Sequence, residues 1–391
     1  MNFGFTEEQD FLRSEVHKFL AERCPLSEVR RIGEEQSGFC IKLWREISEL
    51  GWAGLTIAET HGGAGLSWLD LVVLLEEAGR QLLPLPLLST SVAAHAIAEA
   101  GSERQQAEWL PRLASGEQIA TLAVYEEDDA IEPERIKLRA SPQGDGSWRL
   151  DGAKIFVPDA PNATLFVVAV RTSDGGDGGD EGDEGDEAVR FAVVPAGTPG
   201  VEVEAFPTMD LTKPMGAVRF DCVEIGAEMM LQPDVSSSGS AHADIYKRVI
   251  ARATTALCAE MSGAAEANLQ LAIDYAKERV QFGSPIGRYQ GVKHPLAEMY
   301  QALESFKSLL YYAAWALDER PDEALRYASM AKAQGSDCCA RIGIDAIQIH
   351  GAVGYTWEYD PQLYLKRSKW SRAMYGNANH HYDEIARMGG L

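Results

Sequence analysis

The chain has 391 residues, 46% of them hydrophobic, and a formal net charge of −23 at pH 7. This length predicts two or three domains with a sizeable core, and the negative charge argues against nucleic acid as a partner. No unbroken apolar run of about 18 residues is present, which argues against a membrane span, and the N-terminus lacks the features of a signal peptide. The six cysteines have no metal-ligand spacing, so we expect a cytoplasmic protein with reduced thiols and no metal site.

Helical patterns occupy residues 1–117, which we expect to form an N-terminal α-helical domain. Capping boxes begin at Thr6 and Ser102, apolar residues recur at helical spacing between them, and a break is predicted at Pro111. The glycine-rich stretch 50–67 lies between two helices. It is not part of a strand–turn–helix unit with a downstream acid, so a dinucleotide-binding loop is not favoured.

Residues 118–233 have the pattern of a β domain, either a barrel or a sandwich. Segments of β-branched and aromatic residues alternate with Pro, Gly and Asp turns. The predicted strands are Ile119–Val124, Trp148–Leu150, Lys154–Val157, Thr164–Val170, Val189–Val194 and Val218–Phe220.

An acidic tract, residues 174–187, lies between two of these strands. It holds eight acids and six glycines, so 15 of the 23 negative charges remain without it. Because such a tract buries no apolar surface and its charges repel one another, we predict a disordered surface loop at a hairpin tip. A calcium site is the alternative, although the ligand spacing of an EF-hand is absent.

From residue 234 to 391 the chain is predicted to be helical. Four long patterns joined by short turns, followed by a short helix after Asn379, predict a four-helix bundle. The long patterns cover about 242–281, 288–318, 322–350 and 359–373.

Two stretches of this region have residues suited to a cofactor. The first places Arg279, Phe282, Gln290 and His294 around a Gly-Ser-Pro turn. A guanidinium fork suits phosphate, although a simple helix end with Arg279 in its last turn is the alternative. The second, 348–355, reads Gln-Ile-His-Gly-Ala-Val-Gly-Tyr, and its glycines permit a close backbone approach to a ligand.

These stretches, together with the order α, β, α, resemble the acyl-CoA dehydrogenase family over essentially the whole chain. The resemblance implies an α+β fold and oxidation of an acyl-CoA thioester to the trans-2-enoyl-CoA. A carboxylate takes the α proton, and the flavin of FAD takes a hydride from the β carbon. In this family each FAD lies at a subunit interface, where one subunit seats the flavin and its neighbour contacts the pyrophosphate and adenine.

The residues for the neighbour's side of that site are present. Arg279 and Phe282 match the family's Arg-x-x-Phe-Gly. Gln348, Gly351 and Gly354 match its Gln-x-x-Gly-Gly-x-Gly, with Ala352 in place of the second glycine. With Gln290, they are the residues that the resemblance assigns to FAD binding.

The residues that seat the flavin are largely replaced. The family's Thr-Glu-Pro-Gly-Ala-Gly-Ser-Asp loop corresponds to residues 125–132, Tyr-Glu-Glu-Asp-Asp-Ala-Ile-Glu. Its acids are expected to repel the flavin phosphates. The family's Trp-Ile-Thr corresponds to Phe156-Val-Pro158, where the hydroxyl is lost and the proline has no backbone N–H to donate.

The catalytic base is absent from both of its usual positions, which correspond to Gly376 and Ala253 in this chain. Neither residue can accept a proton, so the catalytic residue is unknown. Four acids are nearby in the sequence, and each is expected to be a solvated or salt-bridged helix residue. They are Asp244, Glu260, Glu358 and Asp383.

Because the losses fall on one half of a shared site, we predict a subunit that serves a neighbour's active site. Heteromeric bacterial members of the family, acting on large substrates such as steroid side-chain thioesters, have such a subunit. The expected partners are a homologous catalytic subunit, an acyl-CoA and an electron-transfer flavoprotein, in dimers of dimers. The alternatives are a self-sufficient homo-oligomer with a relocated base and a non-catalytic scaffold that binds CoA esters.

Overall fold

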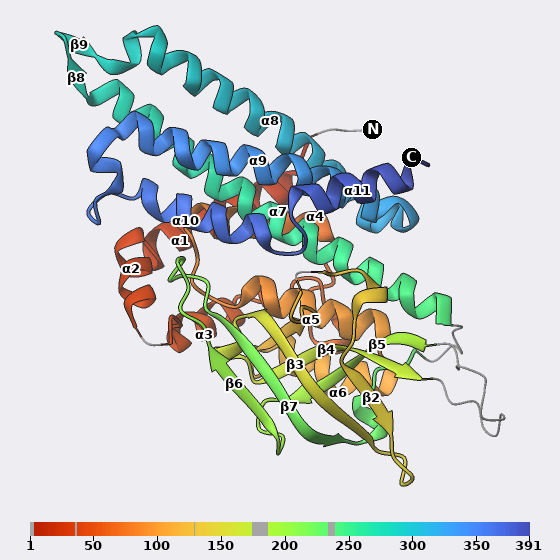
Figure 1. Cartoon of the computed structure of the whole chain (residues 1–391). Helices are drawn as coiled ribbons and strands as arrows, with labels where there is room; N and C mark the ends of the chain where they lie inside the picture. The colour runs from red at the N-terminus through yellow and green to blue at the C-terminus, as the bar shows by residue number, and fades with distance from the viewer. Residues whose placement is uncertain (1–3, 36, 129, 174–186, 234–238) are drawn as a thin grey trace.

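The computed structural model describes residues 4–35, 37–128, 130–173, 187–233 and 239–391. Within these ranges six helices come first, then a β region, then five helices, as Figure 1 shows. The N-terminal helices are α1 (Glu7–Arg23), α2 (Leu26–Glu34), α3 (Ile41–Glu49), α4 (Trp68–Arg80), α5 (Leu87–Ala100) and α6 (Glu103–Ala114). The C-terminal helices are α7 (Gly239–Glu278), α8 (Gln290–Glu319), α9 (Ala324–His350), α10 (Pro361–Ala373) and α11 (Ala378–Met388).

Both capping boxes form as predicted, but the break at Pro111 is wrong. Thr6 and Ser102 accept hydrogen bonds from the backbone N–H groups of Gln9 and Gln105. Helix α6 continues through Pro111 to Ala114, and the Pro111 carbonyl accepts a bond from Ser115. A proline this close to a helix C-terminus removes one hydrogen bond without ending the helix.

The middle region is one seven-stranded sheet that curves into a half-barrel. Its strands run in the order β1-β4-β2-β3-β7-β6, with β5 paired to the other side of β4. Their bounds are β1 Ala120–Ala123, β2 Arg139–Pro142, β3 Trp148–Pro158, β4 Leu165–Ser173, β5 Glu187–Pro195, β6 Val201–Ala205 and β7 Met215–Ile225. The sheet encloses its own core, which includes Val157, Phe166, Val168 and Val218.

Some strand predictions need correction. The two predicted strands at 148–157 are one strand, β3, with register shifts between Leu150 and Gly152 and between Lys154 and Val157. Strands β2 and β6 were not predicted, and β7 is much longer than Val218–Phe220. The hairpin at the acidic tract is confirmed, because β4 and β5 pair in antiparallel fashion up to Ser173 and Glu187. Glu187 opens β5, and residues 174–186, with their predicted disorder and the calcium alternative, lie outside the described residues.

The C-terminal helices are confirmed, with a shifted end for the first of them. Helix α7 ends at Glu278 rather than near 281, because residues 280–285 form a two-stranded hairpin of β8 (Val280–Gln281) and β9 (Ser284–Pro285). No helix in the described part of the chain is long and apolar enough to cross a membrane. The domain boundaries after 117 and 233 stay predictions.

Helix α7 crosses α4 at backbone contact. A Cβ atom added to Gly263 would lie 1.8 Å from the Glu76 carbonyl oxygen, and one added to Gly79 would lie 2.1 Å from the Glu260 carbonyl oxygen. Only glycine fits at such a crossing without moving the helices apart. The N-terminal helices therefore pack directly on the centre of α7.

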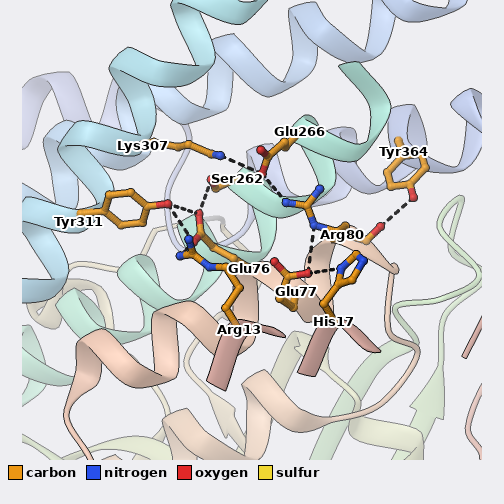
Figure 2. A network of polar contacts seen from close by, with 10 residues as sticks. All are labelled: Arg13, His17, Glu76, Glu77, Arg80, Ser262, Glu266, Lys307, Tyr311 and Tyr364. Carbon is orange, nitrogen blue, oxygen red and sulfur yellow. Dashed lines mark hydrogen bonds and ion pairs between the residues drawn. The ribbon is translucent and has the colours of Figure 1, made fainter. Parts of the chain in front are cut away.

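A polar network surrounds this crossing, as Figure 2 shows. Glu76 of α4 accepts hydrogen bonds from Arg13 of α1 at 3.1 Å, Ser262 of α7 at 2.8 Å and Tyr311 of α8 at 3.0 Å. Burial raises the pKa of the Glu76 carboxyl, and nearby cations oppose that shift. Four helices therefore share one buried carboxyl, which fixes α7 relative to the N-terminal helices.

Candidate functional site

The first candidate stretch forms a tight hairpin at the end of α7. Gln281 pairs with Ser284, so only Phe282 and Gly283 are left at the turn. Their φ angles are +53° and +79°, as a type I′ hairpin turn requires. Figure 1 shows β8 and β9 at one extremity of the molecule, beyond the ends of α7 and α8.

Phe282 is both strained and exposed. A non-glycine residue at positive φ costs about 1 kcal/mol, and the side chain of Phe282 is 92% exposed. The Tyr289 hydroxyl donates to the carbonyls of Gln281 and Phe282 at 3.1 and 3.2 Å, which holds the turn in place. An exposed aromatic ring on a rigid, strained turn indicates a contact outside this chain.

Arg279 and Gln290 flank the hairpin with their side chains in solvent. The Arg279 N–H donates to the Tyr275 carbonyl at 2.8 Å, so the residue caps α7 through its backbone and not through its side chain. Its guanidinium forms no ion pair within the described ranges of the chain. Arg288, by contrast, donates to Ser284 at 3.2 Å.

The second stretch lies at the same end of the helices. Gln348 is exposed in the last turn of α9, and the 3₁₀ turn η7 (Gly351–Tyr355) follows. The His350 ring stacks on Tyr275 in the last turns of α7, with centroids 4.3 Å apart. The fold therefore brings together two stretches that are about 70 residues apart in sequence.

The glycines of the second stretch have different surroundings. Gly351 has a φ of +68° and open space around a Cβ position, as expected where a ligand approaches the backbone. Gly354 is buried, and a Cβ there would lie 2.9 Å from the Cβ of His350. Close packing therefore requires glycine at 354 whatever its role toward a cofactor.

The segment expected to seat a flavin is bound to the C-terminal helices of its own chain. The Tyr125 hydroxyl accepts from the Gly376 N–H at 3.3 Å. The Ile131 carbonyl accepts from the Tyr246 hydroxyl at 2.8 Å, and Glu132 lies 3.1 Å from a ring nitrogen of His380. These three contacts join the segment 125–132 to α7, to α11 and to the turn at Gly376.

Two acids of this segment, Glu126 and Asp128, already have cationic partners in the same chain, which reduces the expected repulsion of phosphate. Glu126 is buried and accepts from Lys154 at 2.7 Å and from the Leu138 N–H at 2.8 Å. Burial lowers the pKa of Lys154 to about 8. Asp128 is paired with Arg135 and Lys137, and the hydrogen bond from Arg135 leads the causes that lower its pKa to about 2. These cationic side chains are therefore already used by carboxylates.

The Gly376 position has no room for a carboxylate unless its neighbours move. Gly376 has a φ of +91°, and a Cβ there would lie 2.5 Å from the His380 ring and 2.9 Å from Nε2 of His381. Ala253 is fully buried in α7. His380 and His381 occupy the space beside Gly376, and no local sequence pattern indicated this role.

The four nearby acids are in ordinary surroundings. Glu260 is buried and lies 2.8 Å from Lys213. Asp244 lies 4.0 Å from Lys247, and Glu358 and Asp383 are exposed. Glu260, Asp244 and Asp383 are salt-bridged or solvated helix residues, as predicted, whereas Glu358 lies in a turn outside the helices.

Phe156 and Pro158 lie at the C-terminal end of β3, an interior strand of the sheet. Phe156 has a φ of +50° at a β-bulge, and its ring packs on Phe206 with centroids 5.9 Å apart. The Pro158 carbonyl accepts from the Thr121 hydroxyl at 2.6 Å. The next residue, Asp159, is buried and accepts from Ser89, and burial raises its pKa. A buried carboxyl is an unsuitable neighbour for an electron-rich flavin.

A cavity of about 490 Å³ lies between α7, α11 and the segment 131–134. Its apolar wall includes Ile131, Tyr246 and Leu325. Five carboxylates and three cationic side chains line the rest, namely Glu132, Glu134, Asp244, Asp322 and Glu384 with Lys247, Arg248 and Arg387. This excess of acids disfavours a diphosphate inside the chain. The sequence did not predict the cavity, because its lining comes from four separate segments.

Family models match this chain over most of its length. The acyl-CoA dehydrogenase N-terminal, middle and C-terminal domain models match residues 6–117, 121–223 and 245–389. Benzylmalonyl-CoA dehydrogenase from Aromatoleum aromaticum is 30% identical over 94% of this chain and 93% of its own length. An acyl-CoA dehydrogenase from Bacillus subtilis is 28% identical over 98% of this chain and 97% of its own length.

Solved structures with the same fold include two-component proteins. The ChsE4-ChsE5 complex from Mycobacterium tuberculosis matches with a TM-score of 0.86 and 27% identity, over 100% of this chain and 99% of that chain. A variant of the Tcur3481-Tcur3483 steroid protein matches with a TM-score of 0.85 and 28% identity, over 98% of both chains. The protein called PigA, solved with FAD and proline, has a TM-score of 0.88 and 26% identity, over 100% of both chains.

Proposed function

This chain belongs to the acyl-CoA dehydrogenase family, and we propose that it acts there as one subunit of a hetero-oligomer, completing an FAD site whose flavin a homologous chain seats. The reaction of the assembly is α,β-dehydrogenation of an acyl-CoA to the trans-2-enoyl-CoA. Two-component relatives of the same fold support the assembly. A cytoplasmic location and an electron-transfer flavoprotein as acceptor are part of this proposal.

One observation carries the proposal: in this chain one half of the family's site is exposed to solvent, and the other half is filled by the chain's own side chains. The Arg279 guanidinium and the Phe282 ring are exposed at the outer end of the helices. The inner half, around Gly376, is closed by Tyr125, His380 and His381. A chain that held its own flavin would need the inner half to be open.

The outer residues fit the pyrophosphate and adenine of an FAD. Arg279 offers a guanidinium fork for phosphate, and Gln348 offers an amide donor and acceptor. Gly351 leaves its backbone open to close approach, and the Phe282 ring offers an apolar face. The inner residues do not fit a flavin, because Tyr125, His380 and His381 occupy the space beside Gly376.

The roles within the assembly follow from these fits. FAD, when bound, accepts the hydride from the β carbon of the thioester. Arg279 and Gln348 of this chain hold and orient the far end of the cofactor, and Phe282 shields it from water. The base that takes the α proton belongs to the catalytic subunit, since neither Gly376 nor Ala253 accepts a proton.

A self-sufficient enzyme with a relocated base is the second candidate. It is supported by one observation, namely that Asp244 alone among the four nearby acids lines the large cavity. If this candidate holds, the isolated chain is an active homo-oligomer, and Asp244→Asn abolishes turnover without changing the fold.

The flavin absorption spectrum of the purified chain, alone and mixed with a homologous chain that has a base and a flavin-seating loop, tests the proposal. We expect no flavin with this chain alone and one FAD per pair of unlike chains in the mixture. Stoichiometric FAD and turnover by the isolated chain would contradict the proposal. A mixture without flavin that still binds acyl-CoA would indicate the non-catalytic scaffold.

A further inference from the structure

A small cavity lies between α7, α9 and α10, enclosed by buried residues. Its free volume for a water-sized sphere is about 10 Å³. Asn268, Arg367 and Ser371 line it, and each of these residues is at most 1% exposed. Asn268 Oδ1, Arg367 Nη1 and Ser371 Oγ have no hydrogen-bond partner among the described residues. Three polar atoms without partners at one buried cavity are costly unless something bonds to them.

The hydrogen bonds of Arg367 show which of its N–H groups have no partner among the described residues. Its Nε donates to Asp210 at 2.7 Å, and its Nη2 donates to Thr212 and to the Leu82 carbonyl. Nη1 lies 3.7 Å from Glu260, too far for a hydrogen bond. Nη1 is therefore the nitrogen of Arg367 without a hydrogen-bond partner among the described residues, and Arg367 lines the cavity.

We infer that this cavity is a binding site for a single water molecule, which accepts a hydrogen bond from Arg367 and donates to Asn268 and Ser371. The volume suits one water, since a buried water needs on the order of 10–15 Å³ of such space and makes about three hydrogen bonds. An anion would be repelled by the partial negative charge on the Asn268 carbonyl oxygen, and a cation would be repelled by the guanidinium. Water alone offers both a donor and an acceptor.

The bound water has a structural role at the junction of the three regions of the chain. Arg367 of α10 contacts Leu82 from the N-terminal region, Asp210 from the middle region and Glu260 of α7. By accepting a hydrogen bond from Arg367 Nη1, the water satisfies a buried donor of the arginine that joins these regions. This role is independent of the proposed flavin site.

A crystal structure of the full chain at about 2 Å resolution tests the site directly. We expect one density peak at about 2.7–3.2 Å from Arg367 Nη1 and from Asn268 Oδ1 or Ser371 Oγ. An empty cavity would overturn the inference. Anomalous scattering at the site after a bromide soak would do the same, because it would identify a halide.

Thermal unfolding of a serine variant gives a second test that needs no crystals. Ser371→Ala removes one partner of the water, and we expect Tm to fall by about 2–4 °C. An unchanged Tm in Ser371→Ala would contradict a bound water.

Discussion

The outer and inner ends of the family's site differ in how their polar groups are satisfied. At the outer end, Arg279 and Gln348 are exposed, and the strained turn at Phe282 is held rigid by Tyr289. At the inner end, the Gly376 N–H is bonded to Tyr125 inside the same chain. In the proposed role, a position without a base, Gly376, is also one whose surroundings are filled by side chains of the same chain. The outer end kept groups that this chain alone does not use.

Gly376→Ala tests the closure of the inner end and has the largest expected effect. The added Cβ meets the rings of His380 and His381, and the positive φ adds strain, so we expect a loss of about 2–4 kcal/mol in the free energy of unfolding. Chemical denaturation measures it. Gly146→Ala is the control, since Gly146 has a φ of +86° but open space around its Cβ. Equal losses in both variants would show that the space beside Gly376 is not closed.

By the same reasoning, Gly376→Glu does not restore a catalytic base. The carboxylate has no room beside the two histidines, so we expect a destabilised chain without dehydrogenase activity in a flavin-coupled assay. Acyl-CoA oxidation by this variant alone, with its own bound FAD, would contradict both the closure and the assignment of catalysis to the partner chain.

Arg279→Ala tests the outer end. Loss of a charged hydrogen bond to phosphate is expected to weaken FAD binding to the assembled complex by about 10- to 100-fold, and Arg279→Lys is expected to be intermediate because it keeps the charge without the fork. Flavin fluorescence titration measures the affinity. Arg288→Ala, in the same hairpin region, is the control. Unchanged FAD affinity in Arg279→Ala with an unchanged fold would remove the outer end from the cofactor site.

The pH dependence of stability probes the inner end through His381. Its Nε2–H donates to the Tyr375 carbonyl at 2.8 Å, and burial lowers its pKa from 6.5 to about 3. Between these values the unfolded state binds a proton that the folded state does not, so stability falls as pH decreases through this window. We expect His381→Gln to reduce the slope by at most about 1.4 kcal/mol per pH unit. Replacing the exposed His294 with Gln should leave the slope of stability against pH unchanged. Equal slopes in the unaltered chain, His381→Gln and His294→Gln would contradict this account.

Phe282→Asn has the smallest expected effect on stability. It separates the effect of the Phe282 ring on this chain alone from its effect on FAD binding by the complex. Asparagine tolerates the left-handed region better than phenylalanine, so we expect the isolated chain to gain about 0.5 kcal/mol while the complex binds FAD less tightly. Val280→Asn, in the neighbouring strand, should not stabilise. A variant that loses stability would show that the Phe282 ring serves this chain's own packing.

The sequence was sufficient for the three-part order and for both stretches at the outer end, because those signals are local. Capping boxes, helical spacing and the Arg-x-x-Phe-Gly run need no knowledge of distant contacts. The hairpin at 280–285 was missed because Val280 and Gln281 continue the helical pattern. Strand β2 was missed because Arg-Ala-Ser-Pro has little apolar content, and its position depends on pairing with β3 and β4.

The closed inner end was beyond sequence reasoning for a different reason. Tyr125 and Gly376 are 251 residues apart, and only the folded chain places them in contact. The sequence showed acids in the segment 125–132 but not that Glu126 turns inward to Lys154. The sequence shows which residues are charged, whereas the ion-pair partner of each charged residue depends on the tertiary structure.

The glycine crossing of α4 and α7 limits how this subunit adapts to a partner. Helix α7 has 40 residues and is about 60 Å long, and it runs from the large cavity to the Arg279 hairpin. With Gly263 against the Glu76 backbone and Gly79 against the Glu260 backbone, neither helix can slide or rotate past the other. The distance from the N-terminal helices to the hairpin is therefore a fixed dimension of the chain. In the proposed hetero-oligomer, a partner subunit must match that dimension, so compatible pairs of chains are selected by shape as well as by contact chemistry.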